Sequence, residues 1–150
     1  MRCLVQRVSQ ASVKIGNRIT GEIGTGLLVL VGFEAADDEG DQVWMIKKLL
    51  NMRIFPDAEE VMNLSLQDIN GELLVVSQFT LHASTKKGNR PSYIKADKPQ
   101  SAQKKYHDFV VSLAKESGKI IETGEFGAMM DVSMVNWGPV TIMLDSRNKE

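Results

Sequence analysis

Two hydroxyl side chains and one amide stand within four positions of one another, in the segment Ser77-Gln78-Phe79-Thr80. Polar groups at the end of an apolar run can hold a polar substrate, and the backbone N–H groups there can stabilise a developing oxyanion. A threonine nucleophile would need an activating base, and the sequence identifies no such base for Thr80. A structural role is also open, because Ser77 and Thr80 can satisfy backbone groups where a strand ends.

The segment Asn136-Trp137-Gly138-Pro139-Val140-Thr141 places a Gly-Pro step inside a run that otherwise has a strand pattern. Proline has no N–H to donate to a neighbouring strand, so this step must lie at an edge or a bulge, or present its backbone to something else. X-Pro bonds are also where cis peptides are found. The local pattern alone favours a turn between strands, with Asn136 as an Asx-turn residue.

Charge is unevenly distributed along the chain, although its formal net charge is only -1. Between positions 86 and 105 a single acid, Asp97, stands against the basic residues Lys86, Lys87, Arg90, Lys95, Lys98, Lys104 and Lys105. Lysine and arginine gathered in one segment favour a surface that contacts phosphate. A solvated loop and helix face would explain the same charges equally well.

Several classes of chemistry have no support in the sequence. It contains no Gly-rich phosphate loop, no Cys-x-x-Cys and no His-Glu-x-x-His, and with only His82, His107 and Cys3 as candidate ligands we expect no zinc site of the usual kinds. Cys3 lies in an apolar alternation and is expected to be a core residue. One cysteine, no signal-peptide pattern and no apolar run near the roughly 20 residues of a membrane span favour a cytoplasmic location and no membrane partner.

The spacing of apolar residues predicts strands and turns over most of the chain. At 150 residues and 43% hydrophobic, one domain covering 1–150 is expected. The Asn70-Gly71 dipeptide predicts a hairpin between 64–69 and 72–76. The other expected strands are 4–8, 11–15 and the 19–23 segment that completes an N-terminal hairpin, a central strand at 27–31 that is apolar on both faces, 120–123, and 132–144.

Two helices are expected as well. The acidic run from Asp37 to Asp41 has helix-starting chemistry and precedes apolar residues at helical spacing, and Pro56 requires that this helix has already ended. Pro99 opens a second helix, which Gly118 closes. The polar segment 82–97 is expected to be a long loop of functional interest, and the charged tail 147–150 is expected to fray. The pattern is therefore α+β, with a mainly antiparallel sheet and two principal helices.

Both polar segments resemble signature motifs of the D-aminoacyl-tRNA deacylases, the D-tyrosyl-tRNA deacylase family. Ser77-Gln78-Phe79-Thr80 is similar to that family's Ser-Gln-x-x-Thr, and the segment 136–141 is similar to its Asn-x-Gly-Pro-x-Thr. The two motifs together in a chain of the family's length are specific. The resemblance spans nearly the whole chain and also covers 5–8, 20–24, 53–55, 62–63, 88–93 and 124–130.

The resemblance implies a barrel-like fold assembled as a homodimer, with no metal or organic cofactor. Its implied activity is hydrolysis of the ester that joins a D-amino acid, or glycine mischarged on tRNA-Ala, to the terminal adenosine of tRNA. The partners implied are therefore tRNA and a second copy of the chain. The role implied is proofreading during translation in the cytoplasm.

The resemblance also implies roles for individual residues. The catalytic segment would be Ser77, Gln78, Phe79 and Thr80; the substrate-binding residues would be Asn136, Gly138, Pro139 and Met129; tRNA would contact Lys86, Lys87 and Arg90. A cis Gly138-Pro139 peptide from one subunit would enter the pocket of the other. Its carbonyls would hold the substrate's ammonium group and exclude an L side chain by steric clash.

Alternatives remain open at this point. Water assisted by backbone amides and the ribose 2′-hydroxyl is the favoured nucleophile, and a covalent Thr80 is the rival. Trp137 departs from the small polar or acidic residue that relatives often carry there, so a role at the subunit interface or the pocket mouth is open, and His82 is given no catalytic role. The competing functions are a nucleic-acid-binding module without chemistry and a general esterase with a hydroxyl nucleophile.

Overall fold

The first strand, β1 (Arg2–Ile15), organises the sheet because three other strands pair with it. In the computed structural model, which describes residues 1–149, β1 pairs antiparallel with β2 (Arg18–Ile23), β3 (Gly26–Gly32) and β8 (Asp131–Asp145). Its alternating apolar residues supply fully buried side chains such as Cys3, Val5 and Val13. The N-terminal hairpin is confirmed, and the two expected strand segments before its turn form one continuous strand.

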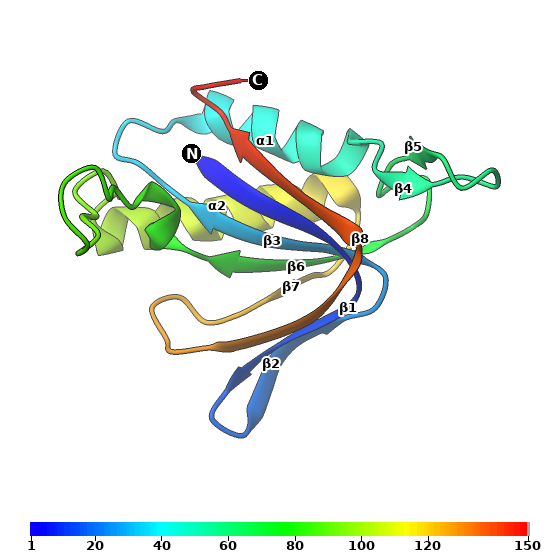
Figure 1. Cartoon of the computed structure of the whole chain (residues 1–150), viewed down its shortest axis with the longest axis horizontal. Helices are drawn as coiled ribbons and strands as arrows, with labels where there is room; N and C mark the ends of the chain where they lie inside the picture. The colour runs from blue at the N-terminus through cyan, green and yellow to red at the C-terminus, as the bar shows by residue number, and fades with distance from the viewer. Residues whose placement is uncertain (150) are drawn as a thin grey trace.

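The sheet continues beyond β3 through β6 (Glu72–Ser77) to β7 (Ile121–Thr123), and these two pairings are parallel. It curls until β2 approaches β7, so that a Cβ atom built on Gly21 would lie 2.7 Å from the Thr123 carbonyl oxygen. The sheet is therefore nearly closed into a barrel (Figure 1). The short strands β4 (Phe55–Pro56) and β5 (Met62–Leu64) form a separate pair. These pairings confirm the expected α+β class and the mainly antiparallel sheet.

Both faces of β3 are buried, as its uninterrupted apolar run predicts. On one face, Leu27 and Val29 join a core that includes the inner sides of both helices. On the other face, Leu28 packs with Val8 and Leu74 inside the curled sheet. The central strand is thus enclosed between the helices and the interior of the barrel.

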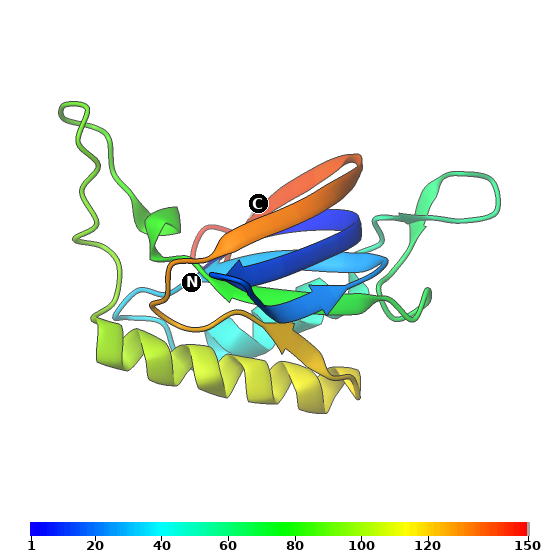
Figure 2. The same ribbon diagram turned by 90° about the horizontal axis from the view of Figure 1, so that it is seen from below.

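Both helices lie on the same side of the sheet (Figure 2). Helix α1 (Glu39–Asn51) begins with a capping box in which Asp38 and Asp41 bond each other's backbone N–H groups. Helix α2 (Pro99–Ser117) has Pro99 in its first turn and ends at Gly118 in the left-handed conformation, with φ 66°. Both helices therefore begin and end as their boundary residues predict.

The hairpin predicted around Asn70-Gly71 is wrong. Residues 65–71 form a compact turn in which the Asp68 carboxylate accepts from the backbone N–H and the hydroxyl of Ser65, at 2.8 and 2.7 Å. Leu66 is fully buried, and its carbonyl accepts from the N–H of Gly71. The dipeptide therefore ends a side-chain-capped turn that leads into β6, whose partners are the parallel strands β3 and β7.

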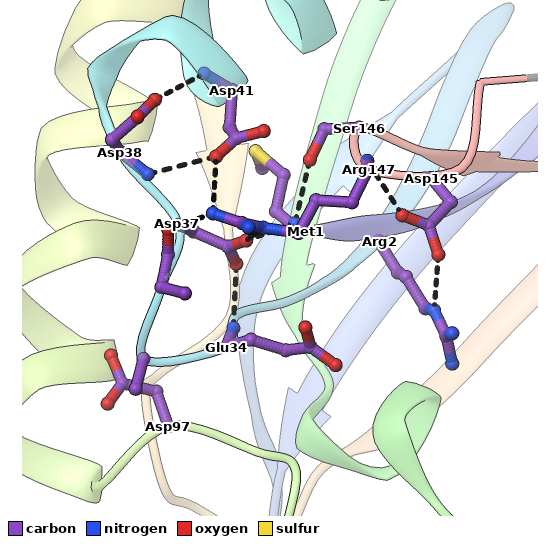
Figure 3. A network of polar contacts seen from close by, with 12 residues as sticks. Met1, Arg2, Glu34, Asp37, Asp38, Asp41, Asp97, Asp145, Ser146 and Arg147 are labelled. Carbon is purple, nitrogen blue, oxygen red and sulfur yellow. Dashed lines mark hydrogen bonds and ion pairs between the residues drawn. The ribbon is translucent and has the colours of Figure 1, made fainter.

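Ion pairs hold the two ends of the chain together (Figure 3). The Met1 ammonium group lies 2.5 Å from an Asp37 carboxylate oxygen and donates to the Ser146 hydroxyl at 2.8 Å. The Arg147 guanidinium also contacts Asp37, at 3.2 Å. The expected fraying of the tail is wrong for Arg147, because Asp37 fixes it beside the N-terminus; Glu150 lies outside the described residues.

Candidate functional site

A cavity of about 590 Å³ lies at the carboxyl ends of the parallel strands β3 and β6. Its walls come from those strand ends, from the first turn of α2 and from the segment that joins β7 to β8. Sequence-predicted residues that line it are Ser77, Gln78, Phe79 and Met129. The cavity therefore brings together three of the four residues of the first predicted motif and one predicted substrate-binding residue, whereas Thr80 is not among its lining residues.

The predicted catalytic segment bends out of β6 into η1 (Phe79–His82), a single 3₁₀ turn. The Gln78 N–H donates to the Val31 carbonyl at 2.7 Å, which joins the start of this turn to β3. The backbone N–H groups of Phe79 and Thr80 open the turn, where donors have no acceptor within the helix. The binding of an oxyanion by these two N–H groups stays a prediction.

The Thr80 hydroxyl accepts a hydrogen bond from the Gln78 side-chain amide, with 2.5 Å between the two atoms. Within residues 1–149, no histidine or carboxylate bonds to this hydroxyl. Because a hydroxyl nucleophile requires a base that removes its proton, the geometry favours a positioning role for Thr80.

The two adjacent methionines between β7 and β8 differ in their surroundings. Met129 is 92% exposed, whereas Met130 packs against the core inside the curled sheet. Both side chains line the cavity. The assignment of Met129 to substrate binding stays a prediction, and the packing of Met130 makes it the more rigid part of the wall.

The second predicted motif forms a bend near the middle of β8 (Figure 2). The register against β1 shifts there, with Asn136 opposite Val8 and Thr141 opposite Gln6. The Gly138-Pro139 peptide is cis, and both residues are exposed. The strand thus turns a short piece of backbone outward, which is how the expected strand tolerates a proline.

The Asn136 side chain braces this bend. Its Oδ1 accepts from the Val140 N–H at 2.8 Å, and its Nδ2 donates to the Val140 carbonyl and to the Thr141 hydroxyl, each at 3.2 Å. The structure therefore explains the spacing of asparagine and threonine in the motif by the geometry of the bend. Direct substrate binding by Asn136 stays a prediction.

Arg7 is a residue of this region that the sequence reasoning missed. It is 7% exposed, and its guanidinium donates to the Trp137 carbonyl at 2.7 Å and to the Ile54 carbonyl at 2.5 Å. It also lies 4.8 Å from the centroid of the Trp137 ring, which packs on Phe55. Burial lowers the pKa of Arg7, but a guanidinium remains charged at neutral pH.

A signal for Arg7 was present in the sequence. It follows Cys3 and Val5 at strand spacing, so it occupies a position that the alternation directs into the core. A charge at such a position is rare unless it is paired or hydrogen-bonded. In this chain the hydrogen bonds go to two backbone carbonyls, that of Trp137 in the bend and that of Ile54 just before β4.

The bend and the cavity lie far apart within one chain. Ser77 on β6 pairs with Val31 on β3, which in turn pairs with Cys3 on β1. The bend on β8 lies opposite Arg7 of β1, which is four residues further along β1, and β8 is three strands away from β6. At about 3.4 Å per residue and about 4.8 Å between strands, the separation is on the order of 20 Å. The structure therefore does not bring Gly138 and Pro139 to the Ser77–Thr80 segment of the same chain.

The basic loop projects from the molecule beside the cavity (Figure 2). Lys86, Lys87 and Arg90 are all exposed, and paired backbone hydrogen bonds between Ser84 and Ser92 close the base of the loop. Tyr93 of this loop packs edge-on against Phe79 of the catalytic segment, with 5.0 Å between ring centroids. The base of the loop therefore lies at the cavity, where Tyr93 is a lining residue. Lys104 and Lys105, by contrast, form ion pairs with Asp108 and Asp97.

Comparison with known proteins shows the family to which the chain belongs. The model of the family described as D-Tyr-tRNA(Tyr) deacylase matches residues 4–145. The chain belongs to this family. The match includes both motifs, the cavity and the bend, so the D-Tyr-tRNA(Tyr) deacylase family resemblance found in the sequence is confirmed.

Relatives of this deacylase family match over the full length of the chain. The D-aminoacyl-tRNA deacylases of Flavobacterium psychrophilum and Porphyromonas gingivalis are 59% and 55% identical, with all of each chain covered. The solved structure of the c-Myc DNA Unwinding Element Binding Protein has a TM-score of 0.91 and 39% identity, covering 97% of this chain and 98% of its own. A probable eukaryotic D-amino acid tRNA deacylase shares the fold, with a TM-score of 0.81, 18% identity, and coverage of 95% and 97%.

The described residues show neither a metal-binding cluster nor a membrane-spanning helix. Residues 1–149 contain no cluster of histidine, cysteine and acidic side chains that could hold a metal ion. None of the helices in that part of the chain is long and apolar enough to cross a membrane.

Cys3 is fully buried, and this burial raises the pKa of its thiol. It therefore belongs to the core, as predicted.

Proposed function

We propose that the chain hydrolyses the ester bond of D-aminoacyl-tRNA, and of glycyl-tRNA mischarged on tRNA-Ala, to give free tRNA and the amino acid. The observation that carries this proposal is the family match, which includes both motifs. Full-length relatives named D-aminoacyl-tRNA deacylase support the same activity. Glycine follows from the selection mechanism below, because it has no side chain to exclude.

The proposed site is built from two copies of the chain. The bend of one copy would enter the cavity of its partner, which the separation of about 20 Å within one chain supports. Among the described strands, β8 pairs only with β1, so its other edge is open. Exposed apolar side chains on this strand are Met134, Val135, Trp137 and Met143. An apolar strand with an open edge favours pairing with another chain.

Chirality would be read by the backbone of the bend. The exposed carbonyls of Gly138 and Pro139 would accept from the substrate's ammonium group, and the Cα atom would then face the bend. An L side chain would collide with this backbone, whereas a D side chain would point away from it. Such steric exclusion does not depend on side-chain chemistry, so it would act on every L-amino acid.

Hydrolysis would use water as the nucleophile. Water adds to the ester carbonyl while the N–H groups of Phe79 and Thr80 stabilise the oxyanion, and collapse of the intermediate returns a proton to the departing ribose oxygen. The ribose 2′-hydroxyl would assist the proton transfers. The bond between Gln78 and Thr80 supports this mechanism, because it occupies the threonine hydroxyl without activating it.

Replacing Thr80 tests the choice of nucleophile. Thr80→Val keeps the branched shape and removes the hydroxyl, so kcat on D-aminoacyl-tRNA should fall by about tenfold or less, through the lost bond from Gln78. Single-turnover kinetics with Thr80→Ser as the matched control measures the change. If Thr80→Val hydrolyses the ester no faster than the uncatalysed reaction while Thr80→Ser remains active, Thr80 is the covalent nucleophile instead.

The basic loop gives a separate prediction about tRNA binding. Lys86→Ala, Lys87→Ala and Arg90→Ala should each weaken tRNA binding and reduce the salt dependence of log K by about one unit of slope per lost phosphate contact. Discrimination between D and L substrates should stay unchanged, because the loop lies outside the bend. Filter binding over a range of salt concentrations measures the slope, with Lys119→Ala as the control, since Lys119 lies beyond α2 and contacts Asn70. An unchanged slope would remove the loop residues from the contact surface.

The deciding experiment compares matched D- and L-aminoacyl-tRNA together with glycyl-tRNA. Release of free tRNA from the D and glycyl substrates, but not from the L substrate, is expected. Equal hydrolysis of both enantiomers would support a general esterase. Tight binding without hydrolysis of any substrate would support a nucleic-acid-binding module.

A further inference from the structure

The residue that ends η1, His82, is a fully buried histidine to which the mechanism above gives no role. Its side chain is 1% exposed, and its Nδ1 lies 3.1 Å from a carboxylate oxygen of Glu34. Its Nε2 is buried and has no hydrogen-bond partner among residues 1–149. Burying an unpaired ring nitrogen costs free energy, so an apolar side chain would suit a merely structural position better.

The imidazole lies directly against Gly32 at the end of β3, the strand that pairs with β6 just before the turn. A Cβ atom built on Gly32 would lie 3.0 Å from the His82 ring and 2.7 Å from the Gln78 carbonyl oxygen. Any side chain at position 32 would therefore displace either the ring or the backbone of the catalytic segment. Because Gly32 has no side chain, η1 packs closely on the end of β3, and the His82 imidazole occupies the space where a side chain at position 32 would lie.

Glu34 is itself held in place on the loop that follows β3. Its N–H donates to the Asp37 carboxylate at 2.6 Å, and its carbonyl accepts from the Lys105 ammonium at 2.8 Å (Figure 3 shows the Asp37 contact). On the other side of the turn, the Arg2 guanidinium donates to the Leu81 carbonyl at 3.0 Å. The turn therefore lies between the Glu34 carboxylate, whose backbone is anchored, and the Arg2 guanidinium, which also bonds Asp145.

We propose that His82 and Glu34 are positioning residues: their hydrogen bond, seated over Gly32, sets the orientation of η1 and therefore of Gln78 and Thr80 at the cavity. This inference rests on the proposed assignment of Gln78 and Thr80 to the ester site. The bond acts from the buried end of the turn, opposite the end that opens toward the substrate. A small rotation of so short a turn would move the oxyanion donors directly.

The main test replaces His82 by leucine, which keeps an apolar volume and removes the bond to Glu34. The melting temperature should stay the same or rise, because the unpaired nitrogen is gone, while kcat falls by about 10- to 100-fold with KM nearly unchanged. His82→Asn should recover much of kcat, since its amide reaches the position of Nδ1 and can still donate to Glu34. His107→Leu, on an exposed position of α2, is the matched control and should behave as wild type.

Glu34→Ala tests the same bond from its exposed side, and keeps the test decisive if His82→Leu does not fold. It should reproduce the fall in kcat, and the double variant should be no worse than either single one. A folded His82→Leu with wild-type kcat, a His82→Asn no better than leucine, or strictly additive losses would each overturn the inference. Absence of D-aminoacyl-tRNA hydrolysis by the wild type would instead defeat the proposed function.

Discussion

Replacing Gly138 by alanine should reduce hydrolysis of D-aminoacyl-tRNA by about 100-fold or more, because the bend that we propose to read the substrate can no longer hold its position. Gly138 has a φ of 146°, which L side chains rarely adopt. An added Cβ atom would lie 2.8 Å from a Val140 methyl group and 2.9 Å from the Arg7 guanidinium. The added methyl must therefore push the bend outward or displace Arg7, and the carbonyls of residues 138 and 139 would move with it.

Gly16→Ala is the control for this variant. Gly16 also has a positive φ, 58°, but a Cβ atom there would meet nothing within 4 Å. It should therefore lose some stability through backbone strain and keep its activity. Steady-state kinetics and thermal unfolding of both variants separate the two effects. Full activity in Gly138→Ala would show that the bend takes no part in the reaction.

Mixing two inactive variants tests whether the site is shared between subunits. Gly138→Ala carries an intact cavity, and Gln78→Ala carries an intact bend, so a heterodimer of the two contains one complete site. Random reassociation of equal amounts should restore about a quarter of the wild-type activity if the sites are built across a two-fold interface. If a confirmed heterodimer recovers no hydrolytic activity, the bend and the cavity of different subunits do not form a common site.

Arg7 gives the second large effect, on stability and activity together. Arg7→Leu would leave the carbonyls of Ile54 and Trp137 without their donor, at a cost of about 1–3 kcal/mol for the buried Ile54 carbonyl and less for the part-buried Trp137 carbonyl. The bend would also lose the cation that lies over Trp137, so hydrolysis should fall by about 100-fold. Urea unfolding and D-aminoacyl-tRNA kinetics on the remaining folded protein measure the two consequences.

Arg7→Lys should be nearly as impaired as Arg7→Leu. A lysine ammonium is a point charge on a flexible stem and does not reproduce a planar guanidinium that donates to two carbonyls in different directions. Arg18→Leu is the control, because Arg18 forms an exposed ion pair with Glu125 and should change stability by less than about 1 kcal/mol. Wild-type kinetics in Arg7→Lys would show that charge alone supports the bend.

Much of the fold was predictable because its signals are local. The uninterrupted apolar run at 27–31 indicated a strand buried on both faces, and the boundary residues Asp38, Pro99 and Gly118 marked the helix ends. The Asn70-Gly71 hairpin failed because the same dipeptide also suits a single capped turn. Which of these forms depends on what the next strand pairs with, and β6 pairs with strands distant in sequence.

By itself, the sequence determined the family, through two motifs of fixed residue types at fixed spacing, including a proline where a strand should exclude one. Only the tertiary structure decided how these motifs lie relative to each other, with Ser77–Thr80 at one end of the sheet and the bend at Arg7 on the order of 20 Å away. It also placed the Arg7 guanidinium against the bend and buried His82 against the end of β3. The physical reason is that strand register, and contacts between residues far apart in the chain, arise from pairing across the whole sheet, which no local pattern encodes.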